Sequence, residues 1–172
     1  MKKIFASGYY PSPLGLLKLD FTPAAILKIE FISRGCEKEG YYNGVDFQNK
    51  EWRKAFNLIF DQFNSYFRGY RKNFTLPCKL EGTAFEKEVW NAIKSIPYGE
   101  TMTYGEIART IGREGAWRAV GQASNKNPLP IIIPCHRVVG TNGSLRGYAG
   151  GEWRKKWLLE HEKGYELQVI SY

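Results

Sequence analysis

The chain has 172 residues, of which 43% are hydrophobic and 15% aromatic, enough to build a packed core in one domain or two small ones and to exclude a disordered chain. No apolar run approaches the ~18 residues that a membrane-spanning helix needs, and three cysteines, an odd number, argue against a disulfide framework. The net charge of +8 favours polyanionic partners. We therefore expect a cytoplasmic protein that does not associate with membranes.

The first third of the sequence predicts a β-meander. Three short apolar runs cover residues 4–10, 14–21 and 25–32. Pro11, Ser12 and Pro13 separate the first two runs, and Thr22-Pro23 separates the next two. Interruptions at this spacing are typical of consecutive antiparallel strands. A polar loop is expected over residues 35–44.

A helix is predicted over residues 49–67, because large apolar side chains recur there at helical spacing. The members of this stripe are Trp52, Phe56, Ile59, Phe60, Phe63 and Phe67. Gly69 is expected to end the helix, and an irregular connection through Pro77 indicates a domain boundary. We place the two domains at residues 1–78 and 79–172.

The second domain is predicted to be mainly helical. Thr83 and Thr103 are each followed three positions later by Glu, the pattern of a capping box that begins a helix. Further helices are expected over residues 116–125 and 152–163, and the last carries Trp153, Trp157, Leu158 and His161 at helical spacing. The helices beginning at Thr103 and at residue 116 have the proportions of a helix-turn-helix, although such pairs are also common packing units.

The candidate reactive group is Cys135, in the segment Pro-Cys-His-Arg at residues 134–137. An apolar run over residues 129–133, expected to be a strand, leads into it and places the Cys-His pair in a core. A thiol attacks as its thiolate, and a neighbouring imidazole can help to form it. A buried structural thiol is the common alternative. A zinc site is a weaker one, because no paired short Cys/His spacing occurs.

The surroundings of Cys135 are basic. Residues 107–151 contain one acid, Glu114, and six basic residues, which are Arg109, Arg113, Arg118, Lys126, Arg137 and Arg146. This excess is consistent with a surface for a polyanion, or with a merely solvated basic face.

Several separated motifs of the second half resemble the O6-alkylguanine-DNA alkyltransferase family, also called methylated-DNA–protein-cysteine methyltransferases. In order they are Ile-Pro-Tyr-Gly-Glu-Thr at 96–101, Arg-Ala-Val-Gly at 118–121, Asn127-Pro128, Ile-Ile-Pro-Cys-His-Arg-Val-Val at 132–139, Gly-Tyr-Ala-Gly-Gly at 147–151 and Trp-Leu-Leu-Glu-His-Glu at 157–162. A weaker similarity lies at residues 12–15.

The resemblance implies an α+β fold. Its amino-terminal part would be a ribonuclease H-like β-meander with a helix, and its carboxy-terminal part a winged-helix-like domain with a helix-turn-helix. It also implies a DNA repair protein that moves an alkyl group from O6-alkylguanine, and from O4-alkylthymine, to its own cysteine, irreversibly and once per molecule. The partner would be double-stranded DNA, which the protein would bind from the minor groove. The protein would be a monomer, and no cofactor or metal is expected.

By motif position, the family's catalytic roles fall on four residues. Cys135 would be the nucleophile and His136 its general base, acting through a water. Glu162 would orient the imidazole. Asn127 would hold the turn before the active-site strand by side-chain hydrogen bonds.

DNA contacts are implied for the helix pair. Arg118 would enter the base stack in place of the flipped nucleotide, and Tyr104 would donate to the purine. Ala119 and Gly121 are small enough to allow a close approach to the minor groove. The bulky Trp117 is expected to face the core.

The alkyl-binding pocket is implied at five positions. They are Tyr148, Ala149, Gly150, Val138 and Pro130. Ala149 stands where vertebrate-like relatives carry Ser, which predicts an altered tolerance of bulky adducts. The backbone carbonyls of Cys135 and Val138 would accept from the guanine amine.

Three other readings compete with the alkyltransferase. A non-catalytic lesion-binding protein would lack the reactive cysteine. A DNA-binding regulator that senses redox or alkylation through Cys135 would be expected to carry a further domain. A cysteine hydrolase would need an oxyanion loop, and no such pattern is visible.

Overall fold

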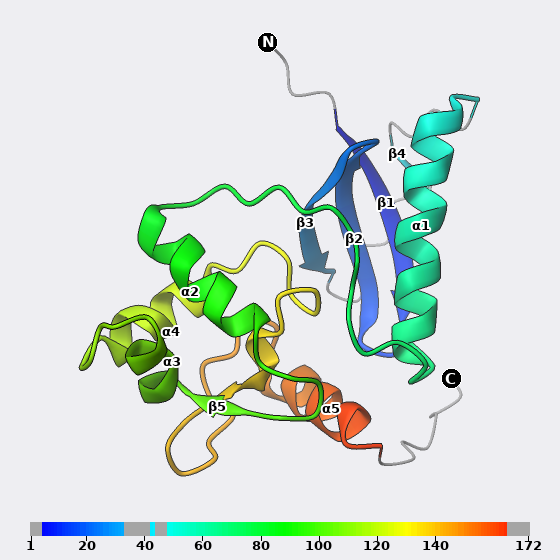
Figure 1. Cartoon of the computed structure of the whole chain (residues 1–172). Helices are drawn as coiled ribbons and strands as arrows, with labels where there is room; N and C mark the ends of the chain where they lie inside the picture. Colours follow the sequence, from blue (N-terminus) through cyan, green and yellow to red (C-terminus); the bar gives the residue numbers. More distant parts are fainter. Residues whose placement is uncertain (1–4, 33–41, 44–47, 165–172) are drawn as a thin grey trace. The chain divides into compact units, whose positions relative to one another are not determined.

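The computed structural model describes residues 5–32, 42–43 and 48–164. The chain forms two compact units, Met1–Leu80 and Glu81–Tyr172, each with its own core (Figure 1). Most of the polar loop expected over residues 35–44 lies outside the described residues, as does Cys36.

The first unit contains an antiparallel sheet in the order β3-β2-β1-β4. Its strands are β1 (Ala6–Ser12), β2 (Gly15–Thr22), β3 (Ala25–Phe31) and the short β4 (Tyr42–Asn43). The expected meander is thus confirmed, but the break predicted at Pro11 is wrong, because Pro11 pairs with Leu16 inside β1. On its other edge β1 pairs with β4 at Ser7 and Gly8, and among the described residues no strand pairs with Pro11 there and needs the N–H that it lacks.

Helix α1 (Lys50–Phe67) covers this sheet and supplies most of the aromatic core. Asn49, the first residue of the predicted helix, is its N-cap, and its side chain accepts a hydrogen bond from the Glu51 N–H. The side chain of Tyr10 on β1 packs edge-on against Phe60, with ring centroids 4.7 Å apart. Gly8 is required beneath α1, because a Cβ at that position would lie 2.8 Å from the Phe56 ring.

Over the residues described up to 164, the second unit contains the four α-helices that were predicted. They are α2 (Ala84–Lys94), α3 (Tyr104–Thr110), α4 (Trp117–Asn125) and α5 (Glu152–Glu162). Both capping boxes form, with Thr83 and Thr103 each accepting from the N–H of the Glu three positions on. Trp90 of α2 donates its indole N–H to the Ala123 carbonyl of α4 at 2.8 Å, which fixes these helices together.

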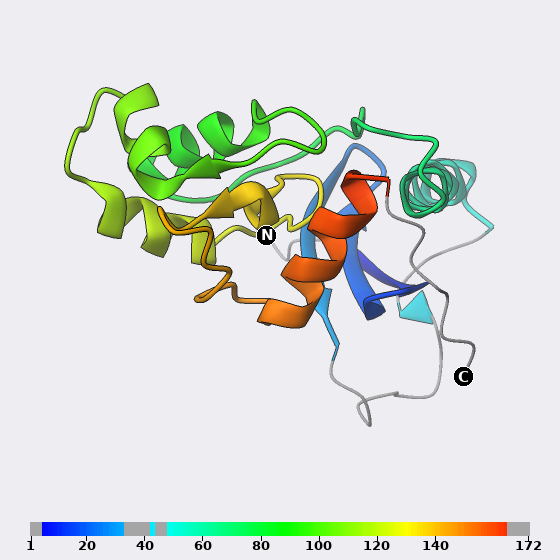
Figure 2. The same ribbon diagram turned by 90° about the horizontal axis from the view of Figure 1, so that it is seen from below.

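The segment between α4 and α5 differs from the prediction. Residues 129–133 form a tight turn and not a strand, with the Ile133 N–H donating to the Leu129 carbonyl at 2.8 Å. Ile131 adopts a left-handed backbone (φ 78°), which is strained for a β-branched residue. A 3₁₀ turn, η1 (Cys135–Arg137), follows and leads into β6 (Val138–Val139), which pairs in parallel with β5 (Met102–Thr103). In Figure 2 this segment lies between α2 and α5.

Candidate active site

The thiol of Cys135 is held at the start of η1 by the side chain of Asn127. Asn127 Nδ2 donates to Cys135 Sγ at 3.0 Å and to the Ile133 carbonyl at 2.8 Å. Its Oδ1 accepts from the Leu129 N–H at 3.0 Å, so all its polar atoms serve the turn. Cys135 is buried, as the apolar flanks predicted, and burial raises the pKa of its thiol while the Asn127 hydrogen bond lowers it.

His136 is fully buried, and its side chain reaches Glu162 of α5. Its Nε2 lies 2.8 Å from Oε1 of Glu162. Burial lowers the pKa of the imidazole, although Glu162 acts in the opposite direction. The neutral ring therefore donates its Nε2 hydrogen to the carboxylate. Among the described residues Nδ1 has no hydrogen-bond partner, which leaves it able to accept a proton.

Glu162 is the centre of a buried network. Its two oxygens accept from Nε and Nη2 of Arg137 at 2.8 and 2.9 Å, and Oε2 also accepts from the Gly99 N–H at 3.2 Å. Burial would raise the pKa of this carboxyl, but hydrogen bonds from His136 and Arg137 outweigh it and hold the pKa well below its usual range. Glu162 is thus a fixed anion that orients His136.

Lys155 of α5 is a site residue that the sequence reasoning missed. It is completely buried, and its Nζ donates to the Val138 carbonyl at 2.6 Å. Its positive charge lowers the pKa of the Cys135 thiol, while its own pKa is lowered by burial. The signal was its spacing, because Lys155, Leu158 and Glu162 recur at helical intervals and form the buried face of α5. Of the residues predicted to share a face of this helix, only Leu158 is buried.

Replacing Lys155 by Met should slow alkylation of Cys135. Loss of the buried charge raises the pKa of the thiol, so less thiolate is present at neutral pH, and we expect a rate lower by about three- to tenfold. The rate of labelling by a neutral alkylating reagent, followed from pH 6 to about 10 by mass spectrometry, measures both the alkylation rate and the pKa of the thiol. Lys156→Met is the matched control, because its side chain is 68% exposed. An unchanged pH profile in Lys155→Met would contradict this role.

The residues expected at DNA lie on α3 and α4. Arg118 is exposed, Ala119 is half-buried, and Gly121 lies beside the Tyr104 ring, which a Cβ at Gly121 would approach to 3.8 Å. The expectation that Trp117 faces the core is wrong, since it is 49% exposed. Trp117 is the first residue of α4, and helical side chains lean toward the amino terminus, so the indole projects beyond the packed part of the helix.

Some of the expected pocket residues lie close to the thiol. Tyr148 is beside it: burial raises the pKa of the phenol well above its ordinary value, and the neighbouring Cys135 adds to the shift. Pro130 and Gly150 are buried, whereas Ala149 is exposed. The Val138 carbonyl already accepts from Lys155, which leaves one lone pair for a ligand.

Neither a metal site nor a membrane span is found in the described part of the chain. Its His, Cys, Asp and Glu side chains form no group of three or more that could hold a metal ion. None of its helices is both long and apolar enough to cross a membrane.

Comparison with known proteins places these features in one family. The family model described as "6-O-methylguanine DNA methyltransferase, DNA binding domain" matches residues 84–164. A methylated-DNA–protein-cysteine methyltransferase of Mycolicibacterium paratuberculosis is 40% identical over 162 residues, 93% of each protein. One of Methanosarcina acetivorans is 57% identical over 101 residues, which are 59% of this chain and 65% of that protein.

A solved structure agrees over nearly the whole chain. The crystal structure of Mycobacterium tuberculosis OGT in complex with DNA superposes with a TM-score of 0.80 at 38% identity, covering 95% of this chain and 96% of the other. The two structures share this mixed α+β fold. The chain belongs to the methylated-DNA–protein-cysteine methyltransferase family.

Proposed function

We propose that the protein repairs DNA by transferring the alkyl group of O6-alkylguanine, and of O4-alkylthymine, to Cys135, irreversibly and once per molecule. The observation that carries this proposal is a buried thiol held by Asn127, next to a histidine whose neutral tautomer is fixed by Glu162. No cofactor enters the reaction. The protein acts as a monomer, and its odd number of cysteines supports a reducing, cytoplasmic compartment.

The transfer is a displacement at the alkyl carbon. His136 Nδ1 takes the thiol proton through a water, because residues adjacent in sequence rarely hold their side chains in direct contact. The sulfur electron pair then forms the S–C bond while the C–O6 bond breaks and its pair goes to the purine. Lys155 stabilises the thiolate before attack. The product is a thioether with no return path, so each molecule acts once.

The leaving guanine needs a proton or a donor as negative charge develops on it. Tyr104 is suited to this role: burial raises the pKa of its phenol and the Cys135 charge adds to the shift, so the hydroxyl stays protonated. The remaining lone pair of the Val138 carbonyl and the Cys135 carbonyl would accept from the purine amine. Tyr148, Pro130, Ala149 and Gly150 would surround the alkyl group.

The damaged nucleotide must leave the duplex to reach a buried thiol, at a cost of a few kcal/mol of unstacking. We propose that the Arg118 side chain fills the place that the flipped base leaves in the stack. Ala119 and Gly121 are small and permit a close approach to the minor groove. As finer descriptions of the fold, we propose a ribonuclease H-like first unit and a winged-helix-like second unit whose α3 and α4 are the helix-turn-helix.

A duplex that carries radiolabelled O6-methylguanine tests the function. We expect one label per protein molecule, recovered on the peptide that contains Cys135, with no turnover. Label released to solvent over many cycles would instead indicate a hydrolase. Binding without transfer would indicate a lesion-sensing protein.

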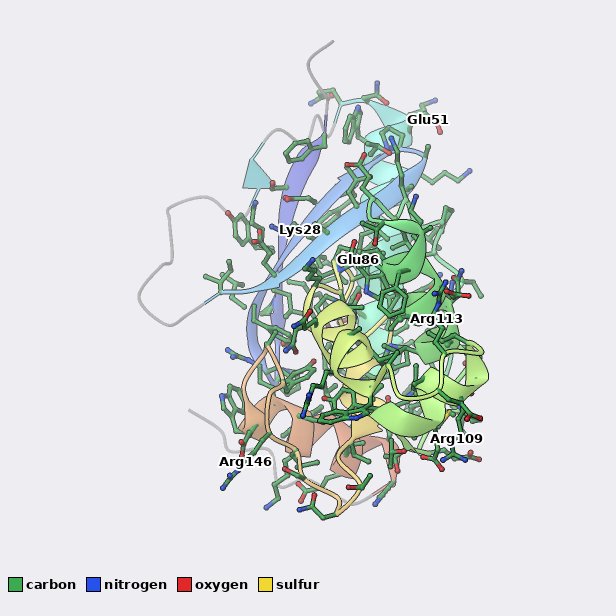
Figure 3. The ribbon with its side chains drawn as sticks, turned by 90° about the vertical axis from the view of Figure 1, so that its left-hand side faces the viewer. Lys28, Glu51, Glu86, Arg109, Arg113 and Arg146 are labelled. Carbon is green, nitrogen blue, oxygen red and sulfur yellow. The ribbon has the colours of Figure 1, made fainter. Side chains whose placement is uncertain are left out.

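Arg118→Ala should separate DNA handling from chemistry. We expect duplex repair to slow by roughly 10- to 100-fold, because the vacated stack is no longer filled, while reaction with free O6-benzylguanine stays within about twofold. Both rates are measured on the same preparation. Arg109→Ala, an exposed cation of α3 that points outward in Figure 3, is the control for loss of one positive charge. Equal losses on both substrates would refute the role of Arg118.

A further inference from the structure

We propose that Trp117 is a second stacking residue of the DNA surface, which holds the Arg118 side chain before binding and covers the base pair beside the flipped nucleotide. The inference rests on the proposed function and deepens it, because it adds a residue that acts on duplex substrates only.

Trp117 and Arg118 already form a stacked pair in the protein alone. The Arg118 guanidinium carbon lies 4.6 Å from the centroid of the Trp117 indole, and the indole is 49% exposed. An exposed tryptophan is costly to keep in water, and large exposed aromatic groups mark binding surfaces more often than the rest of a surface does. Its ring face and the guanidinium plane are both groups that nucleic-acid bases stack on.

In the described part of the chain, no acidic side chain pairs with Arg118. Two neighbouring cations are engaged by α2: Arg113 pairs with Glu88 at 3.2 Å and Lys126 with Glu86 at 2.8 Å. By contrast, the first turn of α4 contains no acid, and Arg118 forms no ion pair with any residue that the structure describes. Its partner is the Trp117 ring, a weak one that a base stack can replace.

The position of Trp117 connects it to the thiol. Trp117 and Gly121 are four residues apart on α4 and share one side of the helix. Gly121 abuts the Tyr104 ring, and Tyr104 lies close enough to Cys135 for the thiolate charge to affect its phenol. The indole therefore lies one helical turn from the residues that we assign to the purine. Ala116 and Ala119 flank the pair and leave the backbone accessible to a groove.

A flipped nucleotide leaves two unstacked base-pair faces, and a single guanidinium covers them incompletely. An indole beside it adds sequence-independent stacking, which suits a protein that must accept any neighbouring base. It follows that Trp117 contributes to duplex affinity but not to the reactivity of the thiol.

Binding to a duplex with one O6-methylguanine, measured in the Cys135→Ser background so that no transfer occurs, tests the proposal. We expect Trp117→Ala to weaken binding roughly tenfold, since base–aromatic stacking changes affinity by about that factor or more, and Trp117→Phe to retain most of it. In a variant that already carries Arg118→Ala, Trp117→Ala should reduce the duplex affinity by a smaller factor than it does alone, because the two side chains act as one unit. Indole emission should be quenched by the duplex, and this quenching should vanish in Trp117→Phe.

Trp153 offers a matched control on α5, since it is 54% exposed and its ring is stacked by Arg154 at 4.5 Å. Trp153→Ala should bind the duplex as the parent does, and Trp153→Phe should keep the quenching. Unchanged affinity of Trp117→Ala, or quenching that persists in Trp117→Phe, would overturn the proposal. So would slower reaction of Trp117→Ala, with Cys135 present, toward free O6-benzylguanine. If wild-type Cys135 accepts no alkyl group from any substrate, the proposed function fails, whereas the binding and quenching results still decide the role of Trp117.

Discussion

Cys135→Ser abolishes alkyl transfer and leaves binding to the lesion-bearing duplex intact. Serine preserves the shape of the side chain and the hydrogen bond from Asn127 Nδ2, which is 3.0 Å from the sulfur. It replaces a thiol by an alcohol that is hardly ionised in water, so we expect the rate to fall by a factor on the order of 10³ or more. Intact-protein mass spectrometry after exposure to an O6-methylguanine duplex measures the transfer, and fluorescence anisotropy of a labelled duplex measures the binding.

Cys78→Ser is the matched control for Cys135. Cys78 is a half-buried cysteine of the first unit, and its Sγ donates to the Leu76 carbonyl at 3.2 Å. This variant should transfer the alkyl group at the wild-type rate. If Cys135→Ser still gains the mass of the alkyl group, the nucleophile has been assigned to the wrong residue.

We expect Glu162→Ala to lower the free energy of unfolding by about 3–5 kcal/mol, because it leaves buried Arg137 without its counter-ion. Arg137 donates two hydrogen bonds to this carboxylate and a third, at 2.6 Å, to the Ile96 carbonyl. Transfer also slows, since His136 loses the acceptor that fixes its tautomer. Chemical denaturation gives the first quantity and single-turnover transfer the second. Glu160→Ala, which removes a partly exposed carboxylate 3.8 Å from Lys156, should change neither.

The double variant Arg137→Met with Glu162→Leu separates the two effects. Both charges are removed together, so most of the lost stability should return, because replacing a buried ion pair by apolar groups is often neutral. Transfer should stay slow, since the apolar pair gives His136 no acceptor. Recovery of both stability and transfer would show that Glu162 only holds the fold.

The same carboxylate predicts how stability depends on pH. The pKa of Glu162 is lower in the folded than in the unfolded protein, so its contribution is fully present above the unfolded value of about 4.3 and is lost as the pH falls through the folded one. The free energy of unfolding of the wild type, obtained from denaturation curves, should therefore fall on acidification below about pH 4.3. The free energy of unfolding of Glu162→Ala should fall less over this range.

The sequence by itself determined the elements that depend on local chemistry. Both capping boxes, at Thr83 and Thr103, begin helices where predicted, because each reciprocal pair of hydrogen bonds involves residues three positions apart. The helix from Lys50 to Phe67 followed in the same way from its periodic aromatic residues. Cys135 and His136 were recognised from their own motif and from its apolar flanks.

Only the tertiary structure decided which polar groups are buried together. Arg137 and Lys155 had no assigned role in the sequence, and Glu162 had one only through the family resemblance. Each is nevertheless buried, because partners distant in the chain satisfy it. Likewise, the turn over residues 129–133 depends on the Asn127 amide, and the exposure of Trp117 depends on where the packing around α4 ends. Burial and charge pairing are set by contacts between segments that meet only in the folded protein, so periodicity and local propensity could not specify them.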